Sequence, residues 1–460
     1  MTIQPQRIRM LKDGEPREGS AYVLYWMQAA KRVHGNHALE YAIDRANELD
    51  LPLACVFGMT DAFPDGNARH YHFMVEGLAE VERDLARRHV TFHGALGSPD
   101  EVALGLSKKA ALVVTDRGYL RIEKEWRQKL AKAIDCPLHQ IETEVVVPVE
   151  TASPKHEYAA RTLRPKIHKL WDEFLVPLSE RRVKRKEPAD VPKSKLDLSD
   201  PAKLVASMKL DHGIGAVKRF RGGQGEARKR LKAFLGKSFA TYGTDRNRPE
   251  ASAASHMSPY LHFGQIGPLE IALAVREATT GGDEDKASYL EELIVRRELA
   301  TNHVFYEERY DDYACLPDWC RKTLGEHAKD KREHVYTERQ LAAGETHDEY
   351  WNASMREMRE TGFMHNQLRM YWGKKIVEWS PSPEEAFRTA LRLNNRYFLD
   401  GRDANSFTNV AWLFGLHDRP WGSRPIFGSI RYLGPATLKK FDADAYVATV
   451  DKLAKAEAGK

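Results

Sequence analysis

Tryptophan and arginine residues in the segment MHNQLRMYWGKKIVEW (364–379) could exchange electrons or hold a charged ligand. On a helix, Trp372 and Trp379 lie seven positions apart on one side, about 10 Å from each other at ~1.5 Å rise per residue. Leu368 and Ile376 lie near the same face. Aromatic stripes with this period usually belong to a hydrophobic core. Taken alone, the segment fits a buried amphipathic helix better than an electron-transfer site.

Arg369 in this segment could pair with Asp400 in the later segment DGRDANSF (400–407). An Asp-Gly-Arg-Asp run after a helix predicts a turn, which could bring the carboxylate to a neighbouring helix. A buried arginine–carboxylate pair is costly unless further hydrogen bonds satisfy it. The polar edge of a cofactor would supply such bonds.

Two other segments combine small polar or charged residues with helical spacing. EASAASHMSPYLHFGQIG (250–267) predicts a helix start at Ser258-Pro259, whose free N–H groups could bind phosphate. Taken alone, the segment is better explained by a plain helix cap. In YLEELIVRRELATNH (289–303), Glu292, Arg296 and Arg297 fall within about one helical turn. Such a cluster either forms an internal ion pair or faces a polar site.

The segment VAWLFGLHDRPWGSRPIFGSIRYL (410–433) interleaves aromatic and basic residues. Trp412 and Trp421 flank a His-Asp-Arg sequence, and Arg424 and Arg431 follow. Arginine side chains suit phosphates, and aromatic rings suit the faces of bases. The pattern indicates a nucleic-acid contact.

The elements that must position these residues differ between the two halves of the chain. Strand-like runs at 21–27 and 52–59 alternate with helical patterns at 37–50 and 68–89. Strands alternating with helices predict a parallel, Rossmann-like α/β sheet. No GxGxxG sequence follows these strands, so the usual dinucleotide site is not supported. The sheet either holds another ligand or none.

The basic and then proline-containing stretch RRVKRKEPADVPKSKLDLSD (181–200) predicts an interdomain linker. Beyond about residue 215, the 3.6-residue period of helices continues to the end. We therefore expect an α/β domain at 1–180, a linker at 181–214 and an all-α domain at 215–460.

The composition sets further bounds. The chain has 460 residues, 42% of them hydrophobic and 30% charged, which suits a protein of two domains with a solvated surface. The N-terminus lacks a secretory pattern and no apolar run spans a bilayer, which predicts a cytoplasmic location. The four cysteines complete no zinc pattern, so we expect reduced thiols and no metal site. A net charge of +5 permits nucleic-acid binding without requiring it.

Together these segments resemble the photolyase/cryptochrome family, specifically the class II cyclobutane pyrimidine dimer photolyases. SxxSPYLHFGQI, EELIVRREL, MHNQLRMYW and LDGRD occur in the order found in that class. The resemblance covers nearly the whole chain. It implies an α/β antenna domain followed by a helical domain that holds FAD in a U-shape.

The resemblance implies specific roles around FAD. Arg369 and Asp400 match the ion pair beside the isoalloxazine ring. Asn394 matches an asparagine facing flavin N5, and Asn366 lies on the same helix as Arg369 in a position that varies within the class. The residues that match positions holding the FAD phosphates are Tyr242, Ser255, His256, Met257 and Ser258, with Arg296 as a weaker candidate.

For the substrate, the resemblance implies that Glu292 hydrogen-bonds the dimer and that Met370 and Trp412 pack against the flipped lesion. It implies an electron path from Trp372 nearest the flavin, through Trp351, to Trp379 at the surface. The residues expected to contact the DNA backbone and the gap left by flipping are Trp421, Arg424 and Arg431.

The activity that the resemblance implies is light-driven splitting of cyclobutane dimers by electron transfer from reduced FAD, in a carbon–carbon lyase. The expected partner is double-stranded DNA containing UV-induced pyrimidine dimers, bound by a monomer near the nucleoid. The main alternative is a cryptochrome-type light sensor; repair of (6-4) photoproducts and a flavoprotein without a DNA role are weaker ones. A deazaflavin-type antenna chromophore stays open, since residues 1–180 do not decide it.

Overall fold

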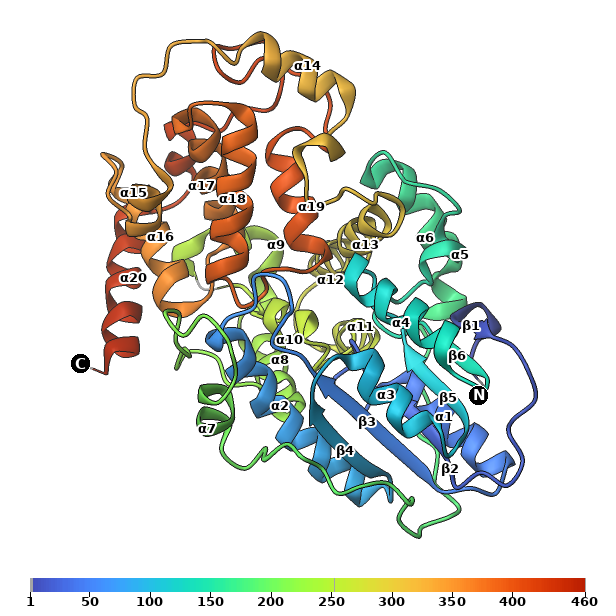
Figure 1. Cartoon of the computed structure of the whole chain (residues 1–460). Coiled ribbons are helices and arrows are strands. Elements are labelled where there is room, and N and C mark those ends of the chain that lie inside the picture. Colours follow the sequence, from blue (N-terminus) through green and yellow to red (C-terminus); the bar gives the residue numbers. More distant parts are fainter. Residues whose placement is uncertain (1–2, 252, 460) are drawn as a thin grey trace.

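A six-stranded sheet forms the core of the N-terminal part, in the strand order β1-β6-β5-β2-β3-β4 (Figure 1). The computed structural model describes residues 3–251 and 253–459. All neighbouring strands are parallel except β1, which runs antiparallel to β6 at one edge. The predicted parallel α/β sheet is confirmed, while the antiparallel edge strand was not predicted. The strands are β1 (Ile8–Lys12), β2 (Tyr22–Trp26), β3 (Leu53–Met59), β4 (Thr91–Leu96), β5 (Ala110–Asp116) and β6 (Leu138–Ile141).

Alternation along the central strands explains the layers on the two faces of the sheet. In β2, Val23 and Tyr25 belong to a core shared with α1 and α2, and Leu24 and Trp26 belong to a core shared with α3 and α4. Strands buried on both faces are near-continuous hydrophobic runs, as parallel sheets require. The four helices are α1 (His37–Glu48), α2 (Ala68–Arg87), α3 (Pro99–Ser107) and α4 (Arg121–Ala133).

The segment from 181 to 214 runs along the α/β part in mostly irregular conformation, with one short helix, α7 (Pro201–Ala206). The backbone N–H of Ala189 donates to Thr91 Oγ1 (2.9 Å), and that of Lys195 donates to the carbonyl of Gly94 (2.8 Å). These bonds dock the segment against the sheet edge formed by β4. The segment 181–214, which was predicted to be an interdomain linker, is therefore packed against the α/β part.

The C-terminal part is helical, as predicted, and its second hydrophobic core contains Trp351, Trp372 and Trp379. Among the described residues, no helix has both the length and the apolar character needed to cross a bilayer. Two helices, α5 (Val149–Ala152) and α6 (Ala160–Phe174), come before the segment 181–214. The helices of the C-terminal part are α8 (Gln224–Lys237), α9 (Tyr242–Asp245), α10 (Ser258–His262), α11 (Pro268–Glu277), α12 (Asp283–Leu290), the π-helical turn η4 (Glu291–Arg296), α13 (Arg297–Tyr306), α14 (Asp318–Glu326), α15 (Glu338–Ala343), α16 (Glu349–Thr361), α17 (Asn366–Trp379), α18 (Pro383–Tyr397), α19 (Ala404–Leu413) and α20 (Ala443–Ala458).

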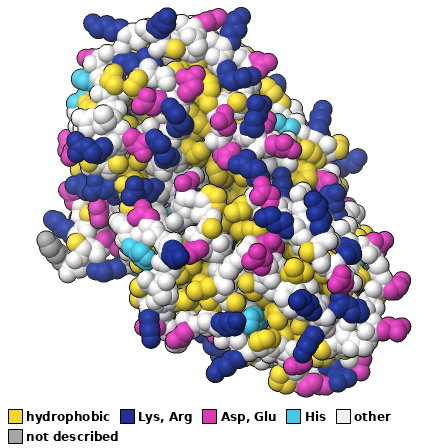
Figure 2. All heavy atoms as spheres, viewed as in Figure 1, with side chains coloured by type: hydrophobic (Ala, Val, Ile, Leu, Met, Phe, Trp, Pro, Cys, Tyr) yellow, Lys and Arg dark blue, Asp and Glu magenta, His cyan; other side chains and the backbone are white. Residues whose placement is uncertain are grey.

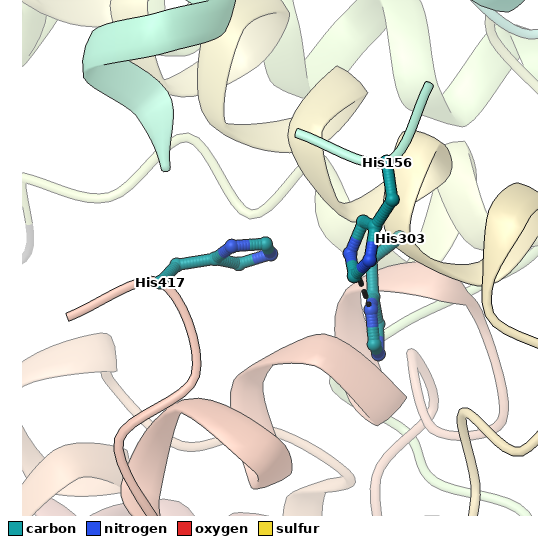
Figure 3. Close-up of side chains that lie close together, drawn as sticks. All are labelled: His156, His303 and His417. Atoms are coloured by element: carbon teal, nitrogen blue, oxygen red, sulfur yellow. Dashed lines mark hydrogen bonds between the residues drawn. The ribbon is translucent and has the colours of Figure 1, made fainter. Parts of the chain in front are cut away.

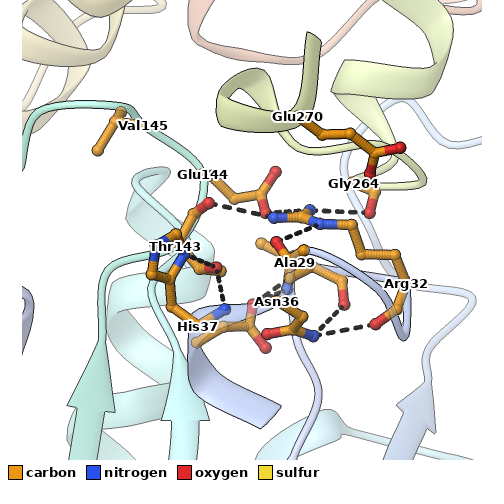
Figure 4. Close-up of polar contacts among 12 residues, drawn as sticks. Ala29, Arg32, Asn36, His37, Thr143, Glu144, Val145, Gly264 and Glu270 are labelled. Atoms are coloured by element: carbon orange, nitrogen blue, oxygen red, sulfur yellow. Dashed lines mark hydrogen bonds and ion pairs between the residues drawn. The ribbon is translucent and has the colours of Figure 1, made fainter. Parts of the chain in front are cut away.

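A buried ionic network joins the two parts (Figure 4). The fully buried Arg32 pairs with Glu144 (2.5 Å) and donates to the carbonyl of Gly264 (3.0 Å) in the helical part. Gly264 has φ +65°, and a Cβ there would lie 2.0 Å from the carbonyl oxygen of Ala29. A buried arginine needs this many acceptors, because an unpaired charge inside a protein is strongly unfavourable. The network fixes the carboxyl edge of the sheet against the helices that line the sites described below.

Candidate functional site

A solvent-open cavity of about 320 Å³ lies among the helices of the C-terminal part. Most of the predicted site residues line it, although they come from five separate segments of the chain. Ligand pockets are typically ~300–1000 Å³, so the volume of this cavity falls within the range of ligand sites. The predicted residues on its wall are Tyr242, Ser255, His256, Met257, Ser258, Glu292, Asn366, Arg369, Met370, Trp372, Asn394 and Asp400.

The predicted pairing of Arg369 with Asp400 is confirmed. Arg369 Nη2 lies 3.0 Å from both carboxylate oxygens of Asp400, and its Nε donates to the carbonyl of Met364 (3.0 Å). The guanidinium also lies 3.8 Å from the centroid of the Phe398 ring. Since both charged groups are largely buried, the pair holds a fixed positive centre on the cavity wall. Such a centre stabilises negative charge on a neighbouring ligand.

Asn394 and His365 bring neutral polar groups to the same wall. Asn394 is buried on α18 and donates from its amide to Asn395 Oδ1 (3.0 Å). His365 caps the start of α17, with its Nδ1 accepting from the backbone N–H of Gln367 (3.2 Å). Burial, with the nearby Arg369 charge, lowers the pKa of His365 to about 4, so its imidazole is neutral at pH 7. These groups can hydrogen-bond a ligand without adding charge.

The segment before α10 supplies a second polar wall. Ser255 Oγ accepts from Tyr289 Oη (2.9 Å), and Arg219 Nη2 lies 3.1 Å from His256 Nε2. Burial lowers the pKa of His256 to about 3. No side chain caps the N–H groups at the start of α10, where Ser258 is the first residue. Free N–H groups at a helix start favour anions, so this wall suits phosphate.

Glu292 lies in a π-helical turn rather than in the continuous α-helix that its sequence pattern predicts. The turn η4 covers Glu291–Arg296, between α12 and α13. Single π-turns occur frequently at functional sites because they turn a side chain out of the regular helical register. Glu292 is 43% exposed on the cavity wall, and its carboxylate is paired with Arg246 (3.1 Å).

The π-helical turn also accounts for one correction. Arg296, expected beside the phosphates, lies outside the cavity, is 52% exposed and pairs with Glu291 (3.1 Å). The extra residue in the turn shifts the side-chain register, and Arg297 faces the cavity instead. The prediction that Arg296 lies beside the FAD phosphates was therefore wrong.

The three tryptophans form a continuous buried group. Trp351 donates from its indole N–H to the backbone carbonyl of Trp372 (3.0 Å), and its ring lies 5.5 Å from that of Trp379. Trp372 lines the cavity, which places Trp351 between the other two. Trp379 was expected at the surface, but it is only 2% exposed, so that expectation was wrong. The rings of Tyr336 (5.4 Å) and His347 (5.2 Å) cover it.

The segment 412–431 gathers the predicted DNA-contact residues at the surface. We call Trp412, Trp421, Arg419, Arg424 and Arg431 the basic–aromatic surface. Trp421 is 39% exposed, with Arg431 (4.4 Å) and Arg419 (4.6 Å) over its ring. Trp412, on α19, lies outside the main cavity and has Arg431 5.4 Å from its ring. Arg424 lies 4.9 Å from the ring of Tyr432.

Charges of both signs cover the face of the molecule shown in Figure 2, where lysine and arginine side chains lie beside acidic ones. This distribution agrees with the small net charge of +5. Local arginine clusters such as the basic–aromatic surface, rather than a basic charge over the whole molecule, must therefore guide any contact with nucleic acid.

A second cavity, of about 150 Å³, lies at the carboxyl ends of β2, β3 and β5. Ligands of open α/β sheets bind at this edge. Its wall includes Phe57, Trp126 and the charged side chains of Lys31 and Glu123. Burial lowers the pKa of Lys31 and raises that of Glu123.

Several residues on the main cavity wall were not predicted from the sequence. Arg246 lies four positions after Tyr242, so helical spacing could have indicated it. Tyr289 opens the segment that carries Glu292, but an isolated tyrosine has no distinguishing pattern. Residues of α19 also contribute, and they follow directly on the DGRD turn. The further wall residues are Asn247, His365, Asp403, Asn405, Ser406 and Asn409.

Comparison with known proteins places these features in context. A family model described as DNA photolyase matches residues 23–188. The chain is 47% identical over 97% of its length, and 98% of the relative's, to a deoxyribodipyrimidine photo-lyase of Methanothermobacter thermautotrophicus. A class III photolyase from Agrobacterium tumefaciens has a similar fold, with a TM-score of 0.73, 21% identity and coverage of 94% of this chain and 87% of that one. A photolyase from Sulfolobus tokodaii described with two FAD molecules has a TM-score of 0.66 at 15% identity, covering 93% of this chain and 89% of that one.

Proposed function

This chain belongs to the deoxyribodipyrimidine photo-lyase family, and we propose that it repairs cyclobutane pyrimidine dimers in DNA in a light-driven reaction. The single observation that carries the proposal is the main cavity, where the Arg369–Asp400 pair, Asn394 and Glu292 converge. The order of its motifs and the grouping of its tryptophans support assignment to class II.

The cavity fits FAD by the chemistry of its walls. Ser255, His256 and Ser258, with Tyr242 and Met257 beside them, would hold the phosphates near the uncapped start of α10. The Arg369–Asp400 pair, Asn394 and Asn366 would hold the flavin ring. When bound in its reduced form, FAD supplies the photoexcited electron that no side chain of the cavity can provide.

The protein's own groups prepare this site for negative charge. Arg369 is held in place by its hydrogen bonds to Asp400, so its guanidinium would stabilise an anionic ring system with little cost of reorganisation. The buried amide of Asn394 offers a neutral partner that neither gains nor loses a proton. The buried path Trp372–Trp351–Trp379 provides a route by which electrons could reach the cavity from outside.

Glu292 and Met370 would receive the damaged bases, with Trp412 supporting the wall from α19. Because Glu292 is paired with Arg246, binding of the dimer requires the carboxyl group to exchange that partner for the dimer's carbonyl region. Flipping costs a few kcal/mol, and less for a damaged pair, which favours the lesion. The basic–aromatic surface would hold the DNA backbone around the gap. The carbon–carbon bonds of the cyclobutane ring break with no net redox change.

The second cavity is the place where an antenna chromophore of the deazaflavin type would bind. Its position at the carboxyl edge of the sheet and its aromatic and charged walls support this. We further infer a monomer that acts on double-stranded DNA in the cytoplasm, at the nucleoid. Absorption spectra of the supernatant after denaturation identify both chromophores, and size-exclusion chromatography with light scattering determines the oligomeric state.

The decisive test uses purified, reduced protein and a duplex oligonucleotide with one cyclobutane dimer. Dimer loss is expected under near-UV or blue light and not in darkness. Glu292→Gln, which keeps the size of the side chain, should lower the yield of repair per absorbed photon, while the exposed control Glu284→Gln should not. Equal dimer loss in light and darkness would refute repair by light, and absence of loss in both with flavin bound would favour a light sensor.

A further inference from the structure

Three histidines far apart in the sequence converge outside both cavities (Figure 3). His156 lies between α5 and α6, His303 on α13, and His417 just after α19. One ring nitrogen from each lies within 4.8 Å of the other two. The ring centroids are 5.1 to 6.0 Å apart. The fold therefore assembles a cluster of three imidazoles from three separate segments.

Hydrogen bonds fix the orientation of two of the rings. His417 Nδ1 donates to the backbone carbonyl of Tyr158 (2.7 Å), which leaves the lone pair on its Nε2 free. Metal-bound histidines usually donate their other ring N–H to a carbonyl or a carboxylate in this way. His303 Nδ1 shares a hydrogen bond with His156 Nε2 (3.1 Å).

Two nitrogens of the cluster lack a partner among the described residues. They are Nε2 of His417 and Nε2 of His303, and both atoms are buried. The whole side chain of His303 is inaccessible to solvent. Buried polar atoms in folded proteins are nearly always satisfied, so the unpaired Nε2 of His417, which carries a lone pair, calls for a further ligand. His303 would offer Nδ1, which lies 3.1 Å from His156 Nε2, and its own Nε2 would then carry the proton. His417 also has φ +59°, a left-handed conformation that is uncommon for a residue other than glycine.

Burial is the largest electrostatic influence on the three imidazoles. Burial lowers the pKa of His303 to about 2 and of His417 to about 4, and it also lowers the pKa of His156. Neutral imidazole has the free lone pair that a metal requires. The charges of Glu307 and Glu157 raise the pKa of His156, and the charge of Arg296 lowers that of His417.

We propose that His156, His303 and His417 bind one divalent transition-metal ion of the zinc class, with water as the fourth ligand. Imidazole ligands suit zinc, copper, nickel and iron, whereas magnesium and calcium prefer oxygen. For Zn–N bonds of about 2.0–2.1 Å, tetrahedral ligands lie about 3.3 Å apart. The His156–His303 separation of 3.1 Å already matches this value, and the remaining nitrogens need to close by about 1.5 Å at most from their 4.8 Å limit.

The ion would act as a clamp on the basic–aromatic surface rather than as a catalyst, since none of the three histidines lines the main cavity. His417 directly precedes Asp418, whose carboxylate pairs with Arg431 (2.8 Å). Tyr158 Oη donates to the carbonyl of Asp418 (3.0 Å), so two bonds already tie this loop to the N-terminal part. A metal bond to His417 would hold the loop more firmly at the same place.

The test is metal binding by the full-length protein with any affinity tag removed. Dialysis against zinc and elemental analysis are expected to give one zinc per chain. Replacement by Co²⁺ should produce the visible d–d absorption of a tetrahedral site. His156→Gln and His417→Gln are the variants of choice because His303 is fully buried, and each should weaken Co²⁺ affinity at least about 10-fold.

His168→Gln is the matched control, because His168 is an exposed histidine outside the cluster. It should bind Co²⁺ like the wild type. Zinc should also slow tryptic cleavage after Arg431, which Tyr432 follows, in the wild type and leave the rate in His417→Gln unchanged. Absence of stoichiometric zinc in the wild type, or equal Co²⁺ affinity in all four proteins, would overturn the proposal. None of these readouts depends on light, flavin or DNA.

Discussion

Lys374 is a fully buried cation on α17 whose charge should control how the stability of the protein changes with pH. Its ammonium group donates to the carbonyl of Leu413, and burial lowers its pKa from 10.5 to about 7. Between those two pH values the unfolded chain binds more protons than the folded one. The free energy of unfolding therefore gains from this group as pH rises through that window. Integrating the linkage relation from pH 7 to pH 9 gives an increase of about 2 kcal/mol in the free energy of unfolding.

Replacing Lys374 by Met removes this titration and keeps most of the side-chain volume. At pH 7 the variant should be more stable, since a buried charge is lost, although the Leu413 carbonyl then lacks a donor at a cost of about 1–2 kcal/mol. The stability difference between variant and wild type should shrink by about 2 kcal/mol from pH 7 to pH 9. Urea unfolding at pH 7, 8 and 9, followed by tryptophan fluorescence, measures it.

The matched control is Lys452→Met, which removes an exposed lysine from α20. Its unfolding free energy should run parallel to that of the wild type across the same pH range. If the unfolding free energy of Lys374→Met also runs parallel to that of the wild type, the ammonium does not titrate between pH 7 and pH 9. The argument from burial then fails.

Three further predictions concern the cavity, the electron path and the junction of the two parts. Asp400→Asn leaves the Arg369 guanidinium buried without its carboxylate and should cost about 2–3 kcal/mol, below the usual cost for fully buried pairs; a loss under 0.5 kcal/mol in urea melts, with flavin retained, would contradict this. Trp379→Phe should slow photoreduction of bound flavin at least about 10-fold, as followed by its absorption, while protein reduced beforehand repairs normally; unchanged photoreduction would rule out this path. Gly264→Ala drives a Cβ against the carbonyl of Ala29 and should lower stability by about 3 kcal/mol; thermal melts matching the wild type would contradict it.

Much of the fold could be predicted from local patterns in the sequence. Strands buried on both faces must be continuous apolar runs, and amphipathic helices repeat their apolar residues every 3.6 positions, so both were visible in the sequence. The segment 364–379, whose spacing fits an amphipathic helix, forms α17 (Asn366–Trp379). The antiparallel strand β1 was missed because Ile8–Lys12 is a short edge strand without buried residues, in which Arg9 and Lys12 interrupt the apolar positions.

Side-chain direction within an element was less predictable than the element itself. The segment 288–304 has helical periodicity throughout, yet η4 inserts a π-turn that exchanges the places of Arg296 and Arg297. Periodicity cannot reveal such a turn, since one extra residue changes the register without changing the composition. Likewise, the spacing of Trp379 from Trp372 was sufficient to place both on one face of α17, but it could not show that Tyr336 and His347 cover the outer ring.

The sequence by itself determined the class of the fold, the helices that carry the tryptophans, and the pairing of Arg369 with Asp400. These depend on local periodicity and on motifs whose members lie on the same or adjacent helices. Only the tertiary structure decided the burial of Trp379, the register of Arg297 and the meeting of His156, His303 and His417. Such contacts join residues up to 261 positions apart, and no local pattern reports them because packing, rather than spacing along the chain, brings them together.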